Sequence, residues 1–228
     1  MVSSLDGPRL APKGRAPKQL VVFLHGYGAD GNDLIAIGQQ WQALLPDAVF
    51  VAPHAAQPCA QAPIGRQWFA MDLRDAKELW RGVNGAAPVL NAFLDTELVR
   101  YGLSADRLAL VGFSQGTMLA LHVGLRRQRL AAILGYSGVL VGPEHLAGTS
   151  KARGTIPPVL LVHGDQDDLI PTEALFVSAE ELAKAGVPCQ WHLSLGIGHG
   201  IDAGGLTQGG LFLAQCFGVK LPAGFARA

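Results

Sequence analysis

Short apolar runs alternate with segments of helical periodicity along most of the chain. Residues Leu20–Leu24 form a continuous apolar run, the pattern of a strand buried on both faces of a sheet. Further strands are predicted at Val49–Ala52, Leu108–Val111, Ile133–Tyr136, Val159–Val162 and Gln190–Leu195. Helices are predicted between them at Asp33–Leu45, Pro88–Tyr101, Thr117–Arg127, Pro171–Ala185 and Leu206–Phe217. Pro88 is expected in the first turn of its helix, where the missing N–H has no intrahelical partner to lose. The alternation predicts an α/β fold, a mostly parallel sheet with helices on both faces.

One stretch departs from this rhythm. Residues 53–87 are rich in alanine, glutamine, glycine and proline, and a connection of that length inside a compact domain is often functional. We therefore expect a single domain over residues 1–228, with 53–87 as a cap or loop beside the binding site. Trp68, Leu73 and Trp80 are candidates for lining a substrate pocket, although ordinary packing explains them equally well.

Composition narrows the class of protein. The chain has 228 residues, 49% of them hydrophobic and 16% charged, and a formal net charge of zero. A neutral chain of this kind predicts a globular fold and no nucleic-acid partner. No apolar run reaches the roughly 20 residues of a membrane span, and the N-terminal stretch lacks the apolar core of a signal peptide. Three widely spaced cysteines do not suggest a disulfide framework, so a cytoplasmic location without stable membrane insertion is expected. No cysteine or histidine pair has the spacing of metal ligands.

A nucleophile motif follows the predicted strand Leu108–Val111. Residues 112–116 read Gly-Phe-Ser-Gln-Gly, which is G-x-S-x-G placed between a strand and a helix. The glycines allow a sharp turn that raises the Ser114 hydroxyl above the carboxyl edge of the sheet, where α/β proteins bind ligands. This context favours a nucleophile over the alternative, a serine in an ordinary glycine-rich turn.

A serine hydroxyl needs a base to take its proton, and His199 is the best candidate among seven histidines. It follows the last predicted strand in a loop of small residues, whereas His192 lies within that strand. His145 precedes the candidate acids, which breaks the Ser–acid–His order of α/β hydrolases. His163 lies just before the acids and fits a structural role better.

The acid that orients the histidine is expected after the strand Val159–Val162. Asp165, Asp167 and Asp168 all lie in this segment. Such a carboxylate holds the imidazole tautomer and stabilises the imidazolium. Spacing alone leaves the three open, because aspartates also form turns and helix caps.

Two backbone N–H groups are predicted to bind the oxyanion. One belongs to Gln115, next to the nucleophile, and the other to Tyr27, in the glycine-rich loop after Leu20–Leu24. That loop could instead bind a phosphate, but the P-loop pattern G-x-x-x-x-G-K-[ST] is absent. We therefore favour the oxyanion role.

Together these segments resemble the phospholipase/carboxylesterase family, which includes acyl-protein thioesterases, lysophospholipases and small bacterial carboxylesterases. LHGYGADGNDL, GRQWF, GFSQG, HGDQDDLIP and GHG occur in the family's order, and the resemblance runs from about Gly7 to about Phe217. It implies an α/β-hydrolase fold with neither metal nor organic cofactor.

The resemblance also assigns roles. It implies a catalytic triad of Ser114, Asp167 and His199, with the backbone of Tyr27 and Gln115 as oxyanion donors. The acid falls on Asp167 because the family pattern there is H-G-x-x-D-x-x-[VI]-P. The chain departs from the thioesterase branch at residue 168, where aspartate replaces a frequent proline. This extra carboxylate is either solvated and without effect, or it makes the site less favourable for acidic head groups.

These observations predict a serine carboxylesterase that hydrolyses short- to medium-chain esters of small molecules through an acyl-enzyme. Thioesters and lysophospholipids are alternative substrates, because the same chemistry accepts either leaving group. A non-catalytic binding protein on this fold is a remote alternative, since its triad would be broken and this one is complete.

Overall fold

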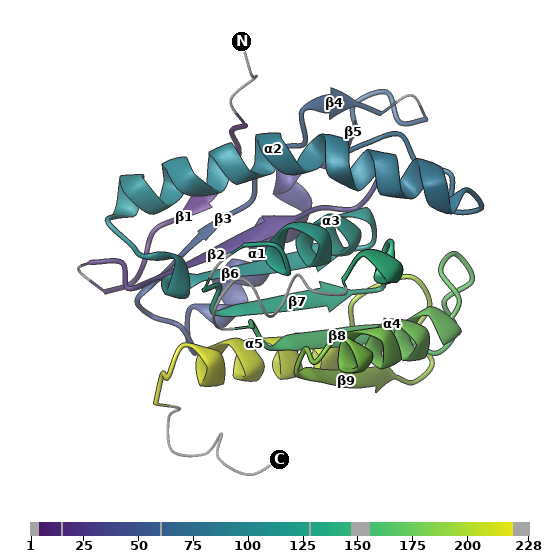
Figure 1. Cartoon of the computed structure of the whole chain (residues 1–228). Coiled ribbons are helices and arrows are strands. Elements are labelled where there is room, and N and C mark those ends of the chain that lie inside the picture. Colours follow the sequence, from purple (N-terminus) through teal and green to yellow (C-terminus); the bar gives the residue numbers. More distant parts are fainter. Residues whose placement is uncertain (1–4, 15, 60, 128, 147–155, 221–228) are drawn as a thin grey trace.

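The computed structural model describes residues 5–14, 16–59, 61–127, 129–146 and 156–220 (Figure 1). Residues 1–4 and 15, in the N-terminal stretch where no signal peptide is predicted, lie outside the described residues. The strands are β1 (Arg9–Leu10), β2 (Gln19–Leu24), β3 (Ala48–Val51), β4 (Gln57–Pro58), β5 (Arg66–Gln67), β6 (Leu108–Phe113), β7 (Ala132–Tyr136), β8 (Val159–Gly164) and β9 (Cys189–Ser194). The helices are α1 (Gly31–Trp41), α2 (Ala76–Tyr101), α3 (Gln115–Gly124), α4 (Glu173–Lys184) and α5 (Ala203–Cys216), with 3₁₀ turns at Ala105–Arg107 and Pro143–His145.

The central sheet has the strand order β1-β3-β2-β6-β7-β8-β9. Strand β1 is antiparallel to β3, and the other neighbours are parallel, which confirms the predicted mostly parallel sheet. Strands β4 and β5 form a separate antiparallel pair. Because parallel strands end at the same edge, the loops after β2, β6, β8 and β9 lie together there.

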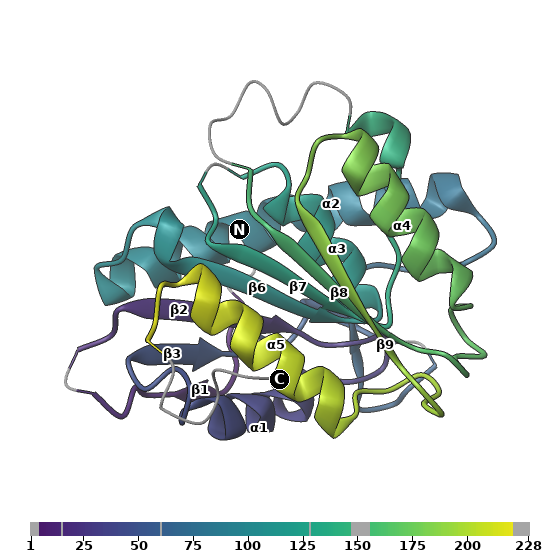
Figure 2. The ribbon, with the colours of Figure 1, turned by 90° about the horizontal axis from the view of Figure 1, so that it is seen from below.

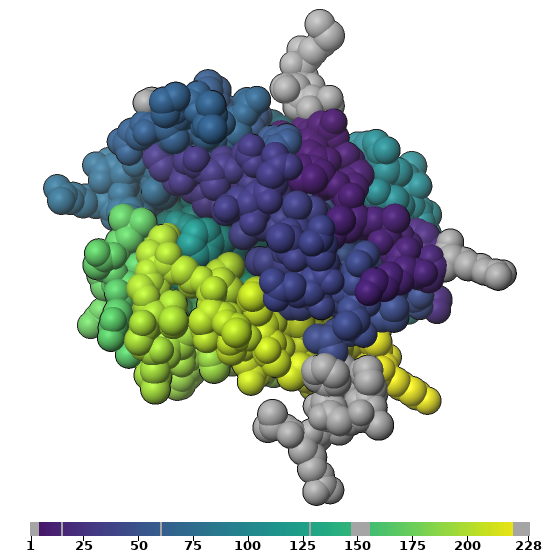
Figure 3. All heavy atoms as spheres, turned by 180° about the vertical axis from the view of Figure 1, so that it is seen from behind, coloured from purple at the N-terminus to yellow at the C-terminus, as the bar shows by residue number. Residues whose placement is uncertain are grey.

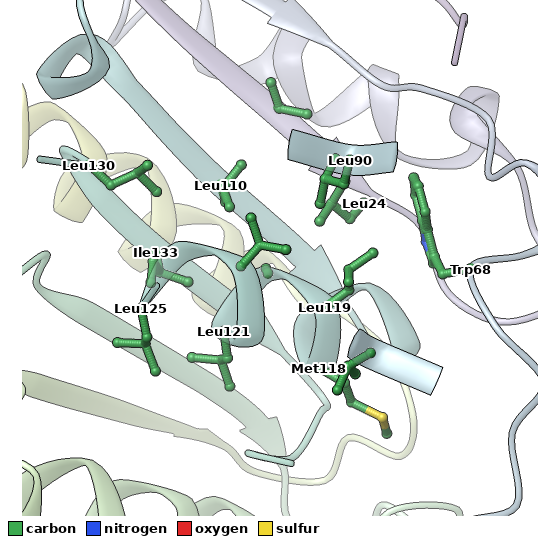
Figure 4. Close-up of a cluster of buried hydrophobic side chains, with 14 of the residues drawn as sticks. Leu24, Trp68, Leu90, Leu110, Met118, Leu119, Leu121, Leu125, Leu130 and Ile133 are labelled. Carbon is green, nitrogen blue, oxygen red and sulfur yellow. The ribbon is translucent and has the colours of Figure 1, made fainter. Parts of the chain in front are cut away.

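Helices cover both faces of the sheet. Figures 1 and 2 show α2, α3 and α4 on one face and α1 and α5 on the other. In β2, Leu20, Val22 and Leu24 pack into the core with α2, α3 and α4, whereas Val21 and Phe23 pack into the core with α1 and α5. Figure 4 shows part of the first of these cores. Within the described ranges, no helix combines the length and apolarity needed to cross a membrane.

The prediction that a helix begins at Pro88 is wrong. Helix α2 begins at Ala76, where the Asp75 side chain accepts two backbone N–H groups, and Pro88 lies inside it. An internal proline costs about 3 kcal/mol, but Val83 before it and Leu90 after it are fully buried, and their packing outweighs that cost. The segment 53–87 therefore contains β4, β5 and the first turns of α2 rather than one irregular connection.

Candidate active site

Ser114 lies in a strained turn between β6 and α3. Its φ of 53° and ψ of −116° are unusual for a residue with a side chain. Its N–H donates to a carbonyl of β7 at 2.9 Å. A Cβ on Gly112 would lie 2.4 Å from the Thr117 nitrogen, and one on Gly116 would lie 1.9 Å from the Leu24 oxygen. The turn therefore needs glycine at both flanking positions of the G-x-S-x-G motif.

His199 is held by a buried carboxylate. Its Nδ1 lies 2.8 Å from Oδ2 of Asp167, whose side chain is fully buried. The other oxygen, Oδ1, accepts the N–H groups of Leu169 at 3.0 Å and Ile170 at 2.9 Å. With the ionised acid as acceptor, the imidazole carries its proton on Nδ1, and Nε2 is the nitrogen that can accept a proton.

The other candidate residues occupy different positions. Asp165 is exposed, and its Oδ1 accepts the N–H of Gly196 at 2.6 Å, in the loop that leads to the histidine. Asp168 is exposed as well. His192 lies within β9, in register with Val162 of β8. The structure thus brings one aspartate of the three onto His199.

The sequence does not reveal that His163 also contacts the Asp167 carboxylate. Its ring is 1% exposed, and its Nε2 lies 2.8 Å from the carbonyl oxygen of Ile170 and 3.2 Å from Oδ2 of Asp167. Both partners are acceptors, so Nε2 carries a proton and donates. The sequence signal for this contact is that His163 lies four residues before Asp167. That spacing does not distinguish a histidine that only packs in the core from one that donates to the carboxylate.

The histidine loop packs closely against the acid loop and the serine turn. A Cβ on Gly164 would lie 2.2 Å from the oxygen of Ile197, which also accepts the N–H of Gln166 at 2.9 Å. The imidazole of His199 lies against the ring of Phe113, with the ring centroids 5.0 Å apart. Since Phe113 immediately precedes Ser114, these contacts place His199 beside the turn that carries Ser114.

The two predicted oxyanion donors lie on segments that meet at Ser114. Gln115 is the first residue of α3, and the first N–H of a helix has no intrahelical partner. Tyr27 follows Gly26, where a Cβ would lie 3.5 Å from the Cβ of Ser114 and 3.0 Å from Phe113. The loop after β2 therefore runs directly against Ser114.

A buried network joins these two segments. The Gln115 side chain accepts the Trp68 N–H at 2.9 Å and donates to the Phe69 carbonyl at 2.7 Å. The Trp68 indole N–H in turn donates to the carbonyl of His25 at 2.9 Å, and the two rings lie 5.1 Å apart. Trp68 thus links the turn that carries Gln115 to the loop that carries Tyr27, a role that sequence reasoning missed.

The loop after β2 also reads G-x-G-x-x-G over Gly26–Gly31, the glycine pattern of dinucleotide-binding loops. The absent P-loop motif therefore does not by itself exclude phosphate. Dinucleotide-binding sites also need an acidic residue about 20 residues after the glycine motif, at the end of the next strand. Here the next strand, β3, is followed by Ala52 and Pro53 instead. Protein also fills the loop's surroundings, because Gly28 donates to the Arg66 carbonyl at 2.9 Å and Arg66 donates to the Ala29 carbonyl at 2.8 Å.

A cavity of about 320 Å³ opens beside the site. Its walls come from the segment that starts α2, the loop after β7 and the loop after β8: Leu73, Ala76, Leu79, Val139–Glu144, Leu169–Pro171 and Ala174. The β7 loop passes close to the backbone of Ser114, since a Cβ on Gly138 would lie 3.0 Å from the Ser114 carbonyl oxygen. In the β8 loop, the lining residues Leu169 and Ile170 donate their N–H groups to the Asp167 carboxylate.

Of the three predicted pocket residues, Leu73 lines this cavity. Trp68 is 5% exposed and belongs to the core and to the network described above. Trp80 stacks on His145, with centroids 3.9 Å apart, and its ring edge meets His122. Neither tryptophan is among the lining residues.

Comparison with known proteins identifies the family and the fold. The family model described as Phospholipase/Carboxylesterase matches residues 5–217. The structure is similar to the crystal structure of esterase PE8, with a TM-score of 0.86 and 42% identity, covering 93% of this chain and 99% of that chain. The sequence is 29% identical to Esterase YpfH of Escherichia coli (strain K12) over 81% of this chain and 77% of the relative. It is 28% identical to Acyl-protein thioesterase 1 of Gibberella zeae over 87% of this chain and 91% of the relative. The architecture is the α/β-hydrolase fold that the sequence predicts.

Proposed function

This chain belongs to the phospholipase/carboxylesterase family, and from that premise we propose that it is a serine carboxylesterase acting on short- to medium-chain esters. The family makes the chain a hydrolase with an esterase or thioesterase function. The observation that carries the finer proposal is the 2.8 Å contact between buried Asp167 and Nδ1 of His199, beside the strained turn of Ser114.

The proposed reaction has two steps. Oγ of Ser114 attacks the ester carbonyl while Nε2 of His199 takes its proton, and Asp167 stabilises the resulting imidazolium. The N–H groups of Tyr27 and Gln115 bind the oxyanion. The imidazolium then protonates the leaving alcohol, and an acyl-enzyme forms. Water, deprotonated by the same nitrogen, attacks this acyl group; the bond to Oγ of Ser114 breaks, the imidazolium returns its proton to Oγ, and the acid leaves.

The cavity beside the site suits the acyl chain. Its volume of about 320 Å³ lies at the lower end of the roughly 300–1,000 Å³ typical of ligand pockets. Leu73, Leu79 and Val139 give it apolar walls. Each buried methylene contributes about 0.8 kcal/mol, so kcat/KM should rise up to roughly fourfold per methylene until the cavity is full. Beyond that length the gain should stop, and long chains should be poorer substrates.

The test combines labelling with a substrate series. A fluorophosphonate should label the unmodified protein and not Ser114→Ala, which should lose roughly 10⁴ or more in kcat with the fold intact. Initial rates with p-nitrophenyl esters from acetyl to palmitoyl should peak at short to medium length. Turnover by folded Ser114→Ala would refute the mechanism. A steady rise to palmitoyl, with a jump when the substrate forms micelles, would instead favour a lysophospholipase.

A thioesterase is the second candidate, because one relative is named Acyl-protein thioesterase 1. The two functions share their acyl-enzyme and differ in the leaving group. An oxygen ester and a thioester of the same acyl chain, compared by kcat/KM, distinguish them. A clear excess for the oxygen ester supports the first proposal.

A further inference from the structure

A second cavity lies on the other side of the sheet from the acyl cavity. It has a volume of about 260 Å³ and is lined by Asp33, Leu34, Ile37, Phe113, Ile201 and Leu206. Figure 3 shows the surface hollowed between purple-blue α1 and the yellow segment that leads into α5, with a teal floor from the middle of the chain. The acyl cavity instead borders α2 and α4, on the opposite face.

Two lining residues of this second cavity lie close to the proposed catalytic histidine, one in space and one along the chain. Its floor residue Phe113 precedes the nucleophile and lies 5.0 Å from the ring of His199. Its wall residue Ile201 lies two positions after His199 in the chain. In the reaction proposed above, Nε2 of this imidazole protonates the departing oxygen, so the leaving alcohol must lie next to it.

The charge at the rim of the cavity is negative. Asp33 is exposed in the first turn of α1, and the other lining residues are apolar. All residues of α1 and α5 are described, and neither helix contains lysine or arginine. An exposed carboxylate attracts a cation modestly, and the face of an aromatic ring such as Phe113 adds to this attraction.

Resting on the proposed serine-esterase function, we propose that the cavity between α1 and α5 binds the leaving alcohol. It favours alcohols with a compact apolar body and a positive charge, such as quaternary ammonium alcohols, over uncharged alcohols of the same shape. Asp33 provides the charge preference, and Leu206 limits the size of the alcohol.

Two butyrate esters test the charge preference directly. The choline ester and the 3,3-dimethylbutyl ester share their acyl group and nearly their shape, and they differ by one positive charge. The ratio of their kcat/KM values should exceed one for the unmodified protein and fall roughly two- to fivefold in Asp33→Asn. Added salt should lower the ratio in the unmodified protein but hardly in the variant. Glu144→Gln is the matched control, because this carboxylate borders the acyl cavity, and it should leave the ratio unchanged.

Filling the cavity tests its location. Leu206→Trp should lower kcat/KM for the 3,3-dimethylbutyl ester roughly tenfold more than for methyl butyrate, whose small alcohol needs little room. Continued turnover of methyl butyrate shows that the variant is folded. The acyl-length profile of methyl esters should not change.

Three results would overturn the inference. An isostere ratio unaffected by Asp33→Asn would remove the charge preference. A shift of the acyl-length profile in Leu206→Trp would assign this cavity to the acyl chain. If the protein hydrolyses methyl butyrate but neither Asp33→Asn lowers the isostere ratio nor Leu206→Trp selectively slows the 3,3-dimethylbutyl ester, the alcohol site alone is rejected. If the unmodified protein hydrolyses no ester, the serine-esterase proposal is rejected with it.

Discussion

Replacing Asp167 by asparagine tests the assignment of the acid most sharply. The carboxylate has four partners: the N–H groups of Leu169 and Ile170 on Oδ1, and His199 and His163 on Oδ2. An asparagine that keeps its oxygen toward the two backbone donors must turn its NH₂ group toward the histidines.

That NH₂ group has a defined consequence for the base. Nδ1 of His199, which now donates at 2.8 Å, would have to accept, so the imidazole proton would move to Nε2. A protonated Nε2 cannot take the proton of Ser114. We therefore expect kcat to fall by roughly 10³ to 10⁴. His163 keeps the Ile170 carbonyl as acceptor at 2.8 Å, so the free energy of unfolding should fall by only about 1–3 kcal/mol.

The neighbouring aspartates provide matched controls. Asp168→Asn changes an exposed side chain and should leave kcat near that of the unmodified protein. In Asp165→Asn the amide oxygen can still accept the N–H of Gly196, so kcat should fall less than roughly tenfold. Initial rates with p-nitrophenyl butyrate, together with urea unfolding of each variant, provide the comparison. A folded Asp167→Asn with near-normal kcat, or an inactive Asp168→Asn, would refute the assignment.

Two further predictions concern stability. Gln115→Met removes the hydrogen-bond partners of the Trp68 N–H and the Phe69 carbonyl. Urea unfolding should show a free energy of unfolding lower by about 2–6 kcal/mol, because two buried groups lose their partners. A loss below about 1 kcal/mol would contradict the proposed importance of these two hydrogen bonds. Burial, reinforced by the charge of Arg126, lowers the pKa of His122 from about 6.5 to about 4. As pH falls, the unfolded chain therefore binds this proton before the folded protein does. The free energy of unfolding should decrease between about pH 6.5 and about pH 4, by at most about 1.4 kcal/mol per pH unit. His122→Leu should flatten that part of the pH dependence of urea unfolding, and equal slopes in both proteins would contradict it.

The sheet could be predicted because each central strand is buried on both faces. Continuous apolar runs such as Leu20–Leu24 have one favourable environment in a globular protein, and the observed β2 contains that whole run. The start of α2 could not be predicted from local signals. Pro88 indicates a helix start by its own chemistry. Only the packing of residues before it, such as Val83, shows that the helix has already begun, at Ala76.

The site divides in the same way. The sharp turn at Ser114 could be predicted because its motif requires glycines at fixed spacing, and the close approaches at both glycines explain that requirement. The acid could not be chosen by spacing, because Asp165, Asp167 and Asp168 lie within four positions of one another. What separates them is direction: one side chain turns inward to His199, one binds a neighbouring loop, and one is exposed. Directions of that kind depend on tertiary contacts.

The role of Trp68 is related to the backbone strain at Ser114, the proposed nucleophile. A positive φ at a residue with a side chain persists only when the surrounding structure enforces it. Ser114 has its N–H bound to β7, and the next residue, Gln115, is bound by its buried side chain to the backbone of Trp68 and Phe69. A few residues farther along the chain, Leu73 borders the acyl cavity. Trp68 and Phe69 therefore hold the start of α3 in place, and the residue of this segment that contacts substrate in our proposal, Leu73, lies beyond them. A change at Gln115 should accordingly reduce stability and turnover together, whereas a change at Leu73 should alter acyl-chain preference alone.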